Sequence, residues 1–566
     1  MDCDVAIIGG GPAGSTAGTL LRKYGPELKV AVFEREVFPR DHIGESQLPA
    51  ISVILEEMGV WDKIEAANFP IKIGSTNRWG KNPELWDFEF YPSERFVDEA
   101  RPAAYQGQRR YTAFQVDRSI YDEILLDHAG ENGVEVRQGT TVKQVLKTGD
   151  RVDGLVLDSG DTVRAKYYVD ASGHTGILRR AMGVDCDYPS TLKNVAFWDY
   201  WQNAEWAVEI GTGGTKIQVM SLGYGWIWFI PLGPTRTSIG LVVPADYYKH
   251  SGKRPEELYA QALREEERIS ALIANAKPEG KFATTKDWSF LSSRQCGDNW
   301  FLAGESAGFA DPILSAGMTM AHAAGREVAF TILEMERGRR SVDWLRDQFG
   351  LRQSQRITSH IRFADFWYTA NAQFSDIKDH VQKIARDAGL ELSPDKAWQW
   401  LAQGGFIDED LSTGTGGFSL FAIKGLGEYL SDLPAGSPFE TCNVFHLDLA
   451  GASWKDRAHY EKGGVAPRQC YIREGKVLPI SGPFEQVVNA VQRASALDDI
   501  MAQFMSFAES QQTEGDRKTA FMQYVQILEA LITDGWAVGS RDPTKPCKRV
   551  TYIGRSLRPN RETILP

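Results

Sequence analysis

Long apolar runs are missing from this 566-residue sequence. No run approaches the roughly 18 consecutive apolar residues that a membrane-spanning helix requires. No secretory signal precedes the first strand pattern, which begins at Asp4. We therefore expect a soluble, cytoplasmic protein without a membrane partner.

Cysteine is also scarce. The six cysteines lie far apart, and no two of them form a C-x-x-C pair. This spacing favours neither a disulfide framework nor a zinc site, so we expect reduced thiols and no metal.

Charge of one sign is not concentrated in any block of the sequence. The 63 basic and 75 acidic side chains leave a net charge of −12. This charge pattern argues against a nucleic-acid partner.

The sequence does contain a large hydrophobic fraction and much tryptophan. Hydrophobic residues make up 42% of the chain. This length is enough for two or three domains, because single cores rarely grow past about 250–300 residues. The sixteen tryptophans raise the expectation of a binding site with aromatic walls.

The clearest functional pattern lies at the start of the chain. The apolar run Asp4–Ile8 ends in glycines with the spacing G-x-G-x-x-G, and a helical pattern follows over Ser15–Lys23. This strand, turn and helix predict a phosphate-binding nest, where the backbone approaches a pyrophosphate and the helix N-terminus faces the anion. The residues predicted to bind the pyrophosphate are Gly9, Gly11, Pro12, Ala13 and Gly14.

A second apolar strand supports this interpretation. Lys29–Phe33 ends in Glu34, twenty residues past Gly14, where a carboxylate accepts hydrogen bonds from a ribose. The context of strand, helix and strand favours an adenine dinucleotide over the alternative, a glycine-rich turn followed by an incidental acid.

Two further segments narrow the class of protein. Phe69–Gly74 reads F-x-x-K-x-G around Lys72, and Gly225–Pro231 reads G-W-x-W-x-I-P. The second run has strand period, so its two tryptophans share one face, and Ile227 and Phe229 share the other. Taken alone, this run also fits a buried strand that happens to be aromatic.

A third segment joins a strand to a long helix. Trp300–Gly308 reads as a strand that enters a small-residue turn at Gly304 and Glu305, and Phe309–Gly317 reads F-x-x-P-x-x-S-x-G. A helical pattern follows over Met318–Met335, and free amides at a helix N-terminus stabilise an anion. An ordinary helix start is the alternative.

Together with Phe38–Ser46, which reads F-P-R-x-x-I-G-E-S, these motifs resemble the flavin-dependent halogenases of the phenol, pyrrole and carrier-tethered branch. The resemblance covers about residues 1–335. It implies an α/β fold, with a Rossmann-like FAD-binding domain of the flavin monooxygenase type. It also implies an inserted substrate-side β-sheet from about 70–114 and 185–290.

The resemblance assigns roles to individual residues. Lys72 is expected to deliver hypohalous acid to an electron-rich carbon, while Trp226 and Trp228 keep the organic substrate away from the flavin. Besides the nest and Glu34, the residues expected to contact FAD are Arg40, Glu45, Ser46, Arg118, Glu305, Asp311 and Met318. The residues expected to lie near the halide are Ser315, Ala316 and Gly317.

Cofactors and partners follow from the same resemblance. It implies that the protein consumes reduced FAD, O2 and chloride or bromide in the biosynthesis of an antibiotic-like secondary metabolite. Because the sequence has a single dinucleotide nest, we expect a separate flavin reductase as partner. The implied substrate is a small aromatic molecule or an acyl group tethered to a carrier protein.

Two other functions fit part of the pattern. An FAD-dependent aromatic hydroxylase shares the nest, Glu34, Arg118 and Glu305, but it needs neither Lys72 nor the tryptophan strand. A flavin-bound docking or regulatory protein would keep FAD and consume no halide.

The remaining chain is less informative. We expect residues 336–420 to be a helical region, since Ser341–Gly389 has helical periodicity with an aromatic face that favours a core stripe over a substrate wall. The aromatic residues of that face are Phe363, Phe366, Trp367 and Phe374. We expect residues 421–481 to be a linker with short strands, and residues 482–566 to form a winged-helix-like unit that packs or docks and does not bind DNA.

Overall fold

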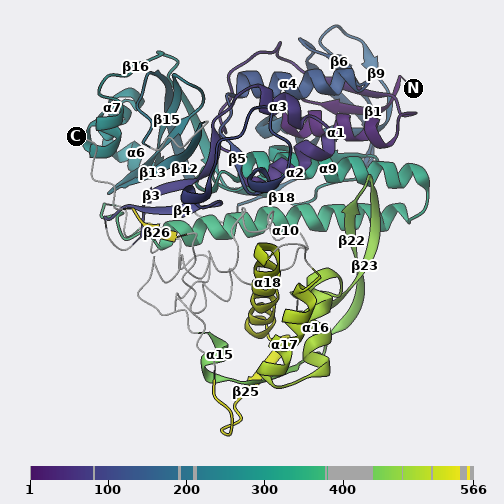
Figure 1. Ribbon diagram of the computed structural model, residues 1–566. Helices are drawn as coiled ribbons and strands as arrows, with labels where there is room; N and C mark the ends of the chain where they lie inside the picture. Colours follow the sequence, from purple (N-terminus) through teal and green to yellow (C-terminus); the bar gives the residue numbers. More distant parts are fainter. Residues whose placement is uncertain are drawn as a thin grey trace. The chain divides into compact units, whose positions relative to one another are not determined.

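The computed structural model describes residues 2–80, 83–188, 193–207, 213–376, 379, 437–474, 476–510, 514–547 and 557–560. The chain divides into two compact units (Figure 1). The first comprises Met1–Gly389, Tyr460–Val465 and Arg555–Pro566, and the second comprises Leu390–His459 and Ala466–Gly554. All predicted site residues belong to the first unit.

A five-stranded parallel sheet with the order β19-β10-β1-β2-β6 organises the first unit. Its strands are β1 (Cys3–Ile8), β2 (Val30–Phe33), β6 (Glu135–Arg137), β10 (Ala165–Asp170) and β19 (Trp300–Leu302). β1, β2 and β19 are buried along almost their whole length. Burial of both faces explains why these strands read as continuous apolar runs.

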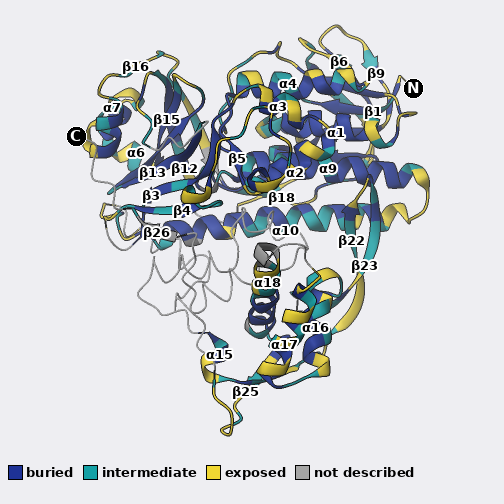
Figure 2. Ribbon diagram, in the orientation of Figure 1, coloured by how far each residue is buried: buried dark blue, intermediate teal, exposed yellow. Residues whose placement is uncertain are grey.

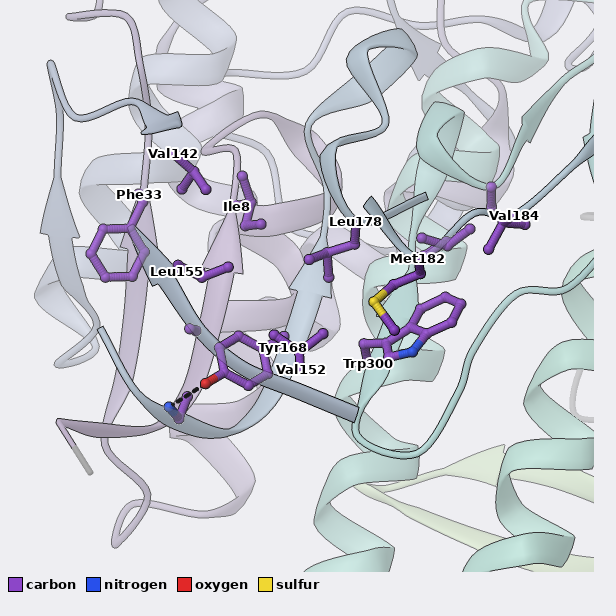
Figure 3. Close-up of a cluster of buried hydrophobic side chains, with 14 of the residues drawn as sticks. Ile8, Phe33, Val142, Val152, Leu155, Tyr168, Leu178, Met182, Val184 and Trp300 are labelled. Atoms are coloured by element: carbon purple, nitrogen blue, oxygen red, sulfur yellow. Dashed lines mark hydrogen bonds between the residues drawn. The ribbon is translucent and has the colours of Figure 1, made fainter. Parts of the chain in front are cut away.

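One face of this sheet packs against β7 (Val142–Thr148), β8 (Arg151–Leu157) and α5 (Ile177–Ala181). Figure 3 shows the buried cluster between them, where Tyr168 accepts a hydrogen bond from the N–H of Ala165 at 2.8 Å. The labelled members are Ile8, Phe33, Val142, Val152, Leu155, Tyr168, Leu178, Met182, Val184 and Trp300. Burial of these mostly apolar side chains holds the nucleotide-side sheet in place.

Helices form a second layer of the first unit (Figure 1). They are α1 (Pro12–Tyr24), α2 (Pro49–Met58), α4 (Arg118–Glu131), α9 (Ala316–Arg337) and α10 (Val342–Thr369). The imidazole of His322 on α9 is hydrogen-bonded to Thr16 on α1 and to Tyr121 on α4, both at 2.8 Å. Burial lowers the pKa of His322 to about 3, so a neutral ring joins these helices at neutral pH.

A ten-stranded sheet forms the substrate side of the unit, with the main order β16-β12-β15-β14-β13-β3-β4-β26. Its strands are β3 (Ile71–Arg78), β4 (Trp86–Glu89), β5 (Ala113–Phe114), β12 (Lys193–Gln202), β13 (Gly214–Leu222), β14 (Gly225–Pro231), β15 (Arg236–Pro244), β16 (Lys277–Pro278), β17 (Ala283–Trp288) and β26 (Leu557–Pro559). The predicted inserted sheet is therefore confirmed. The sequence did not predict that β26, near the end of the chain, extends the sheet by pairing with β4.

The residues of the predicted aromatic face lie on or just after α10, which Figure 2 shows as a mixture of buried, intermediate and exposed positions. Phe363, Trp367 and Phe374 are buried, and the ring centroids of Trp367 and Phe374 lie 5.9 and 5.2 Å from that of Trp79. Phe363 and Trp367 lie buried on α10 as the core stripe predicted, whereas Phe374 lies beyond the end of the helix at Thr369 and is not part of its face. The side chain of Phe366 lies outside the described residues.

The second unit has its own apolar core. Its helices are α15 (Pro438–Thr441), α16 (Gly482–Arg493), α17 (Leu497–Ala508) and α18 (Glu514–Thr533), and its strands include β21 (Val444–Leu447), β24 (Lys476–Pro479) and β25 (Ala537–Ser540). Phe484, Ile500, Phe504, Leu528 and Trp536 lie in the core, and β21 pairs with β25. β22 (Ser453–Glu461) and β23 (Gly464–Arg473) form a three-stranded sheet with β24, and their connecting end, Tyr460–Val465, is counted with the first unit. The proposed domain boundaries and the winged-helix comparison stay predictions.

Two features are absent from the described residues. No helix there combines the length and the apolar character needed to cross a membrane. Nor do His, Cys, Asp or Glu side chains gather there in a group that could hold a metal ion. The six cysteines are free thiols.

A buried ion cluster ties α9 to α10. Glu327 on α9, whose side chain is 3% exposed, accepts hydrogen bonds from Arg352 Nε at 2.6 Å and Arg356 Nη1 at 2.9 Å on α10. Burial alone would raise the pKa of Glu327, but the two arginines lower it from 4.5 to about 2. The charged carboxylate is therefore strongly favoured in the folded chain.

Glu327→Gln removes the carboxylate that both guanidinium groups bind. We expect it to lower the free energy of unfolding by about 3–5 kcal/mol, the usual effect of breaking a buried ion pair. In the parent protein this contribution is complete above the unfolded-state pKa of about 4.5 and is lost as pH falls through about 2.

Melting temperatures at pH 7 and pH 3 check this prediction. Asp343→Asn is the control, because the 82% exposed Asp343 forms a surface ion pair with Arg346 and should change stability by about 1 kcal/mol or less. Equal melting temperatures for the two variants at pH 7 would contradict the assigned role of Glu327.

Candidate active site

The predicted nest lies between β1 and α1. Gly11 precedes α1 with no side-chain cap, and the first turn of α1 contains no acid. A Cβ at Gly14 would lie 1.9 Å from the carbonyl oxygen of Gly9, so close packing of the turn excludes a side chain there. A Cβ at Gly11 would meet nothing nearer than Arg40 Nη2 at 3.8 Å. The space beside Gly11 fits a pyrophosphate.

The turns after three parallel strands meet at this nest. Gly9 follows β1, and a Cβ there would lie 2.3 Å from the carbonyl oxygen of Ala171, which follows β10. Gly304 follows β19, and a Cβ there would lie 3.5 Å from Cβ of Ala13. Ligands of open parallel sheets bind at such carboxyl ends.

Glu34 lies at the end of β2 and is buried. Its two carboxylate oxygens accept hydrogen bonds from the N–H groups of Gly10 at 2.7 Å and Glu36 at 2.9 Å. Each oxygen has a second lone pair for a ribose hydroxyl. The structure therefore brings the predicted ribose acid next to the nest.

Two arginines bind the same acid beside the nest. Arg118 forms a bidentate pair with Asp122 at 2.7 and 2.8 Å and also donates to the carbonyl oxygens of Ile43 and Gly44. Arg40 Nη1 lies 3.1 Å from Asp122. Arg118 is buried, and it holds the loop that contains Glu45. Sequence reasoning missed Asp122, although its spacing of four residues from Arg118 on a helix was a usable signal.

Lys72 lies on β3 and is buried, with an exposed fraction of 2%. Its Nζ donates to the carbonyl oxygen of Gln47 at 2.9 Å and lies 5.4 Å from the ring centroid of Phe90. Burial, with no charged partner to offset it, lowers the pKa of Lys72 from 10.5 to about 7. By contrast, the buried Lys216 on the neighbouring β13 pairs with Asp87 and Glu89, both at 2.8 Å.

The lysine motif F-x-x-K-x-G ends at Gly74, and the packing of β3 against β4 shows why glycine is needed there. A Cβ there would lie 2.0 Å from the carbonyl oxygen of Phe88 on β4. Only glycine lets the two strands pair at this point, and a register shift between Thr215 and Lys216 on β13 faces the same stretch of β3. The motif therefore fixes the strand geometry around Lys72.

Several buried polar side chains near Lys72 have atoms without a hydrogen-bond partner in the described structure. They are Glu45, Ser46, Gln47, Gln115 and Thr215. In the backbone, Thr215 on β13 lies opposite Lys72 on β3, and Ser46 forms an isolated β-bridge with Gln115. Because buried polar groups are normally hydrogen-bonded, this cluster fits a site whose occupant carries polar atoms. Burial raises the pKa of Glu45 to about 7, although Ser238 and Tyr200 favour its charged form.

The tryptophan strand β14 lies between β13 and β15. The rings of Trp226 and Trp228 share a face, with centroids 6.0 Å apart, while Ile227 and Phe229 belong to an apolar core. The predicted alternation of faces is confirmed. The indole N–H of Trp226 donates to Tyr368 at 2.7 Å, and that of Trp228 donates to Ser238 at 3.1 Å.

The predicted anion turn leads directly into α9. The helix begins at Ala316, two residues earlier than the predicted Met318, so Ala316, Gly317 and the buried Met318 form its first turn. Ser315 has a φ of 53° and precedes the helix, and no acid or side-chain cap occupies this end. The helix end therefore presents amides that suit an anion.

Glu305 lies beside the turn at Gly173 and the anion turn at Gly317. Its carboxylate oxygens are 3.9 Å from the Cβ positions of Gly173 and Gly317. A charged Glu305 would repel an anion at this helix end, but burial raises its pKa, opposed by His174 and Arg118. The neutral carboxyl that burial favours is compatible with both a ribityl hydroxyl and a nearby anion.

Asp311 lies in a different set of contacts from the nest. Its carboxylate accepts hydrogen bonds from the N–H of Ile313 at 2.9 Å, from Tyr368 at 3.2 Å and from Asn194 at 3.2 Å. Burial raises the pKa of Asp311 to about 7, although these donors favour its charged form. Tyr368 and Asn194 lie outside every sequence motif, so no sequence signal indicated them.

The residues at the nest fit an FAD molecule: the space beside Gly11, the lone pairs of Glu34, and Arg40 beside the helix end. Comparisons with known proteins also indicate an FAD-binding domain. The family model of the FAD binding domain matches residues 2–364. The 1H-pyrrole-2-carbonyl-[peptidyl-carrier protein] chlorinase of Pseudomonas fluorescens is 34% identical over 350 residues, which span 59% of this chain and 76% of that protein.

Two further comparisons extend this result. The tryptophan 2-halogenase of Chondromyces crocatus is 33% identical over 56% of this chain, and the match spans 58% of that protein's length. The crystal structure of CmlS, a flavin-dependent halogenase, has a TM-score of 0.71 over 98% of this chain and 100% of that one. At 24% identity, this last likeness concerns the fold alone.

Gly11→Ala and Gly14→Ala test the nest as a pair. Ala at position 11 has room and an extended backbone with φ −70°, so the variant should fold normally and bind FAD at least ~10-fold more weakly. Ala at position 14 collides with Gly9 and should lower the melting temperature as well. Calorimetry and flavin fluorescence measure both effects. Normal FAD affinity in Gly11→Ala would contradict the placement of the pyrophosphate.

Proposed function

Because the chain belongs to the flavin-dependent halogenase family, we propose that it halogenates an electron-rich carbon, using reduced FAD, O2 and chloride or bromide. The observation that carries the proposal is Lys72, a fully buried amine that is bound by a carbonyl oxygen and has no ion pair in the described chain. Lysine is almost never fully buried unless it is paired, and strongly perturbed pKa values cluster at functional sites.

The proposed roles of the residues follow from their places. Reduced FAD and O2 supply the oxidant that turns a halide ion into hypohalous acid. The amides of Ala316 and Gly317 would hold the halide, and Trp226 and Trp228 would keep the organic substrate from the flavin. Lys72 would bind the hypohalous acid and present it to the carbon, as a neutral amine or as a hydrogen-bonding ammonium.

We propose a carrier-tethered acyl group or a small aromatic molecule as the substrate. The relative from Pseudomonas fluorescens is named for a pyrrole-2-carbonyl group on a peptidyl carrier protein. That name supports the tethered class for this chain without fixing the acyl group.

Product analysis tests the reaction. The purified protein, reduced FAD, O2 and chloride, incubated with a panel of phenols and carrier-tethered acyl groups, should yield product with the isotope pattern of chlorine. With bromide, brominated product should form, because backbone amides select an anion by charge and approximate size. Oxygenated product that contains neither halogen would instead support an aromatic hydroxylase.

Lys72→Met tests the proposed catalytic amine. We expect halogenation to fall at least ~1000-fold, the scale expected when a positioned catalytic group is removed, while FAD binding is retained. The folded-state pKa of Lys72, about 7, lies below its ordinary value of 10.5. Stability therefore rises with pH between these values, and the variant should lose this dependence and melt at a higher temperature at pH 7.

Lys216→Met is the matched control on the neighbouring strand. It removes a buried lysine with two carboxylate partners, so it should melt at a lower temperature and keep halogenation within about tenfold. Halogenation by Lys72→Met at the parent rate, on the same carbon, would contradict the role of Lys72.

We also propose that a separate reductase supplies the reduced flavin, because the sequence contains one dinucleotide nest. The purified chain alone should oxidise NADPH no faster than free FAD does, and addition of a flavin reductase should start halogenation. Absorbance at the NADPH band measures both. Rapid NADPH oxidation by the chain alone, stimulated by substrate, would exclude a two-component system.

A further inference from the structure

A buried hydrogen-bonded network connects the tryptophan strand to the turn before α9. The indole N–H of Trp226 on β14 donates to the hydroxyl of Tyr368 on α10 at 2.7 Å. That hydroxyl donates to Asp311 Oδ1 at 3.2 Å. Asn194 on β12 donates to Asp311 Oδ2 at 3.2 Å and also approaches the Tyr368 hydroxyl at 3.3 Å. All four side chains are buried.

The hydroxyl of Tyr368 can make one donated and two accepted hydrogen bonds. It donates to Asp311, and it accepts from Trp226 and Asn194. Its position therefore links the plane of the Trp226 indole to the Asp311 carboxylate, because loss of the hydroxyl would leave the buried indole N–H without this hydrogen bond.

At the end of the network opposite Trp226, Asp311 shapes the anion turn that precedes α9. Its Oδ1 accepts the N–H of Ile313 at 2.9 Å and caps the short 3-10 turn Pro312–Leu314. That turn ends at Ser315, which adopts the left-handed conformation from which α9 starts. A residue that is not glycine holds this conformation only where its surroundings impose it. Asp311 is a buried side chain that caps the turn leading to Ser315.

The hydroxyl of Tyr368 can be removed by substitution without changing the packing of its ring. The ring packs against Trp79 and Phe374, with centroids 5.7 and 6.0 Å away. Phenylalanine at position 368 would keep this packing and would remove the contacts of the hydroxyl with Trp226, Asp311 and Asn194. The network can therefore be tested without opening the core.

We infer that Tyr368 and Asp311 are positioning residues for halide use: they hold the Trp226 indole and the first amides of α9 in one fixed arrangement. This inference rests on the proposed function, in which those amides bind the halide. Neither residue needs to touch the halide or the flavin. Loss of the network should weaken halide binding by disordering the turn, and should leave the FAD nest intact.

Tyr368→Phe is the first test, and Tyr259→Phe is its matched control. The hydroxyl of Tyr259 also accepts an indole N–H, from Trp201 at 3.0 Å, and donates to the Ile239 carbonyl at 3.0 Å, but it has no link to the anion turn. Bromide is titrated into the FAD-loaded proteins and followed by flavin absorbance, which needs no turnover. We expect roughly tenfold weaker bromide binding in Tyr368→Phe and binding within about twofold of the parent in Tyr259→Phe.

Asp311→Asn provides a second variant. An amide presents a single acceptor oxygen, so one of the donors around Asp311 would face an N–H group. Bromide binding should weaken to a similar extent, and the double variant should be little worse than either single variant, because both changes break one network. In turnover, the KM for chloride should rise more than kcat falls, while the FAD content stays at that of the parent.

Three outcomes decide the inference. Parent-like bromide affinity in both Tyr368→Phe and Asp311→Asn would overturn it, and so would a parent protein that binds no bromide. A parent that binds bromide, loses this binding in the variants and yet forms no halogenated product would uphold the inference and contradict the proposed function.

Discussion

The main constraint on the substrate-side sheet of the first unit is that it buries one amine, Lys72, without a counter-ion among the described residues. Moving the Lys72 ammonium out of water is unfavourable. Burial lowers its pKa to about 7, and the described residues offer it the Gln47 carbonyl and the face of the Phe90 ring. Lys216, one strand away, shows the ordinary solution, since two carboxylates surround it. The packing of β3 at Gly74 and the rest of the substrate-side sheet must keep Lys72 in a place that its own energetics disfavour.

The segment Phe38–Ser46 relates this amine to the nest. Arg40 lies beside Gly11 at one end of the segment, and Glu45 at the other end comes two residues before Gln47, the partner of Lys72. Between them, Asp41 forms ion pairs with Arg236 at 3.0 Å and Lys281 at 2.8 Å on the substrate side. One short segment therefore fixes the geometry of the dinucleotide site relative to Lys72.

Much of the nucleotide side was predictable because its signals are local. The strand, glycine turn and helix at residues 4–23 follow from spacing alone, and Glu34 follows from its distance along the chain. The same holds for the two faces of β14, since strand period is a local property. Boundaries were less exact: α9 starts at Ala316, because the left-handed Ser315 and the Asp311 cap set the helix start, and neither is visible in an apolar pattern.

By itself, the sequence determined the nest, the lysine strand, the tryptophan strand and the class of chemistry that these motifs serve, because each is a short run whose geometry its own residues impose. Only the tertiary structure decided which side chains meet. Asp122 meets Arg40 from a distant segment, and Tyr368 meets Trp226 and Asp311, which lie 142 and 57 residues away along the chain. Such pairs depend on how a helix and two sheets pack, and packing at that range leaves no periodic trace in the sequence.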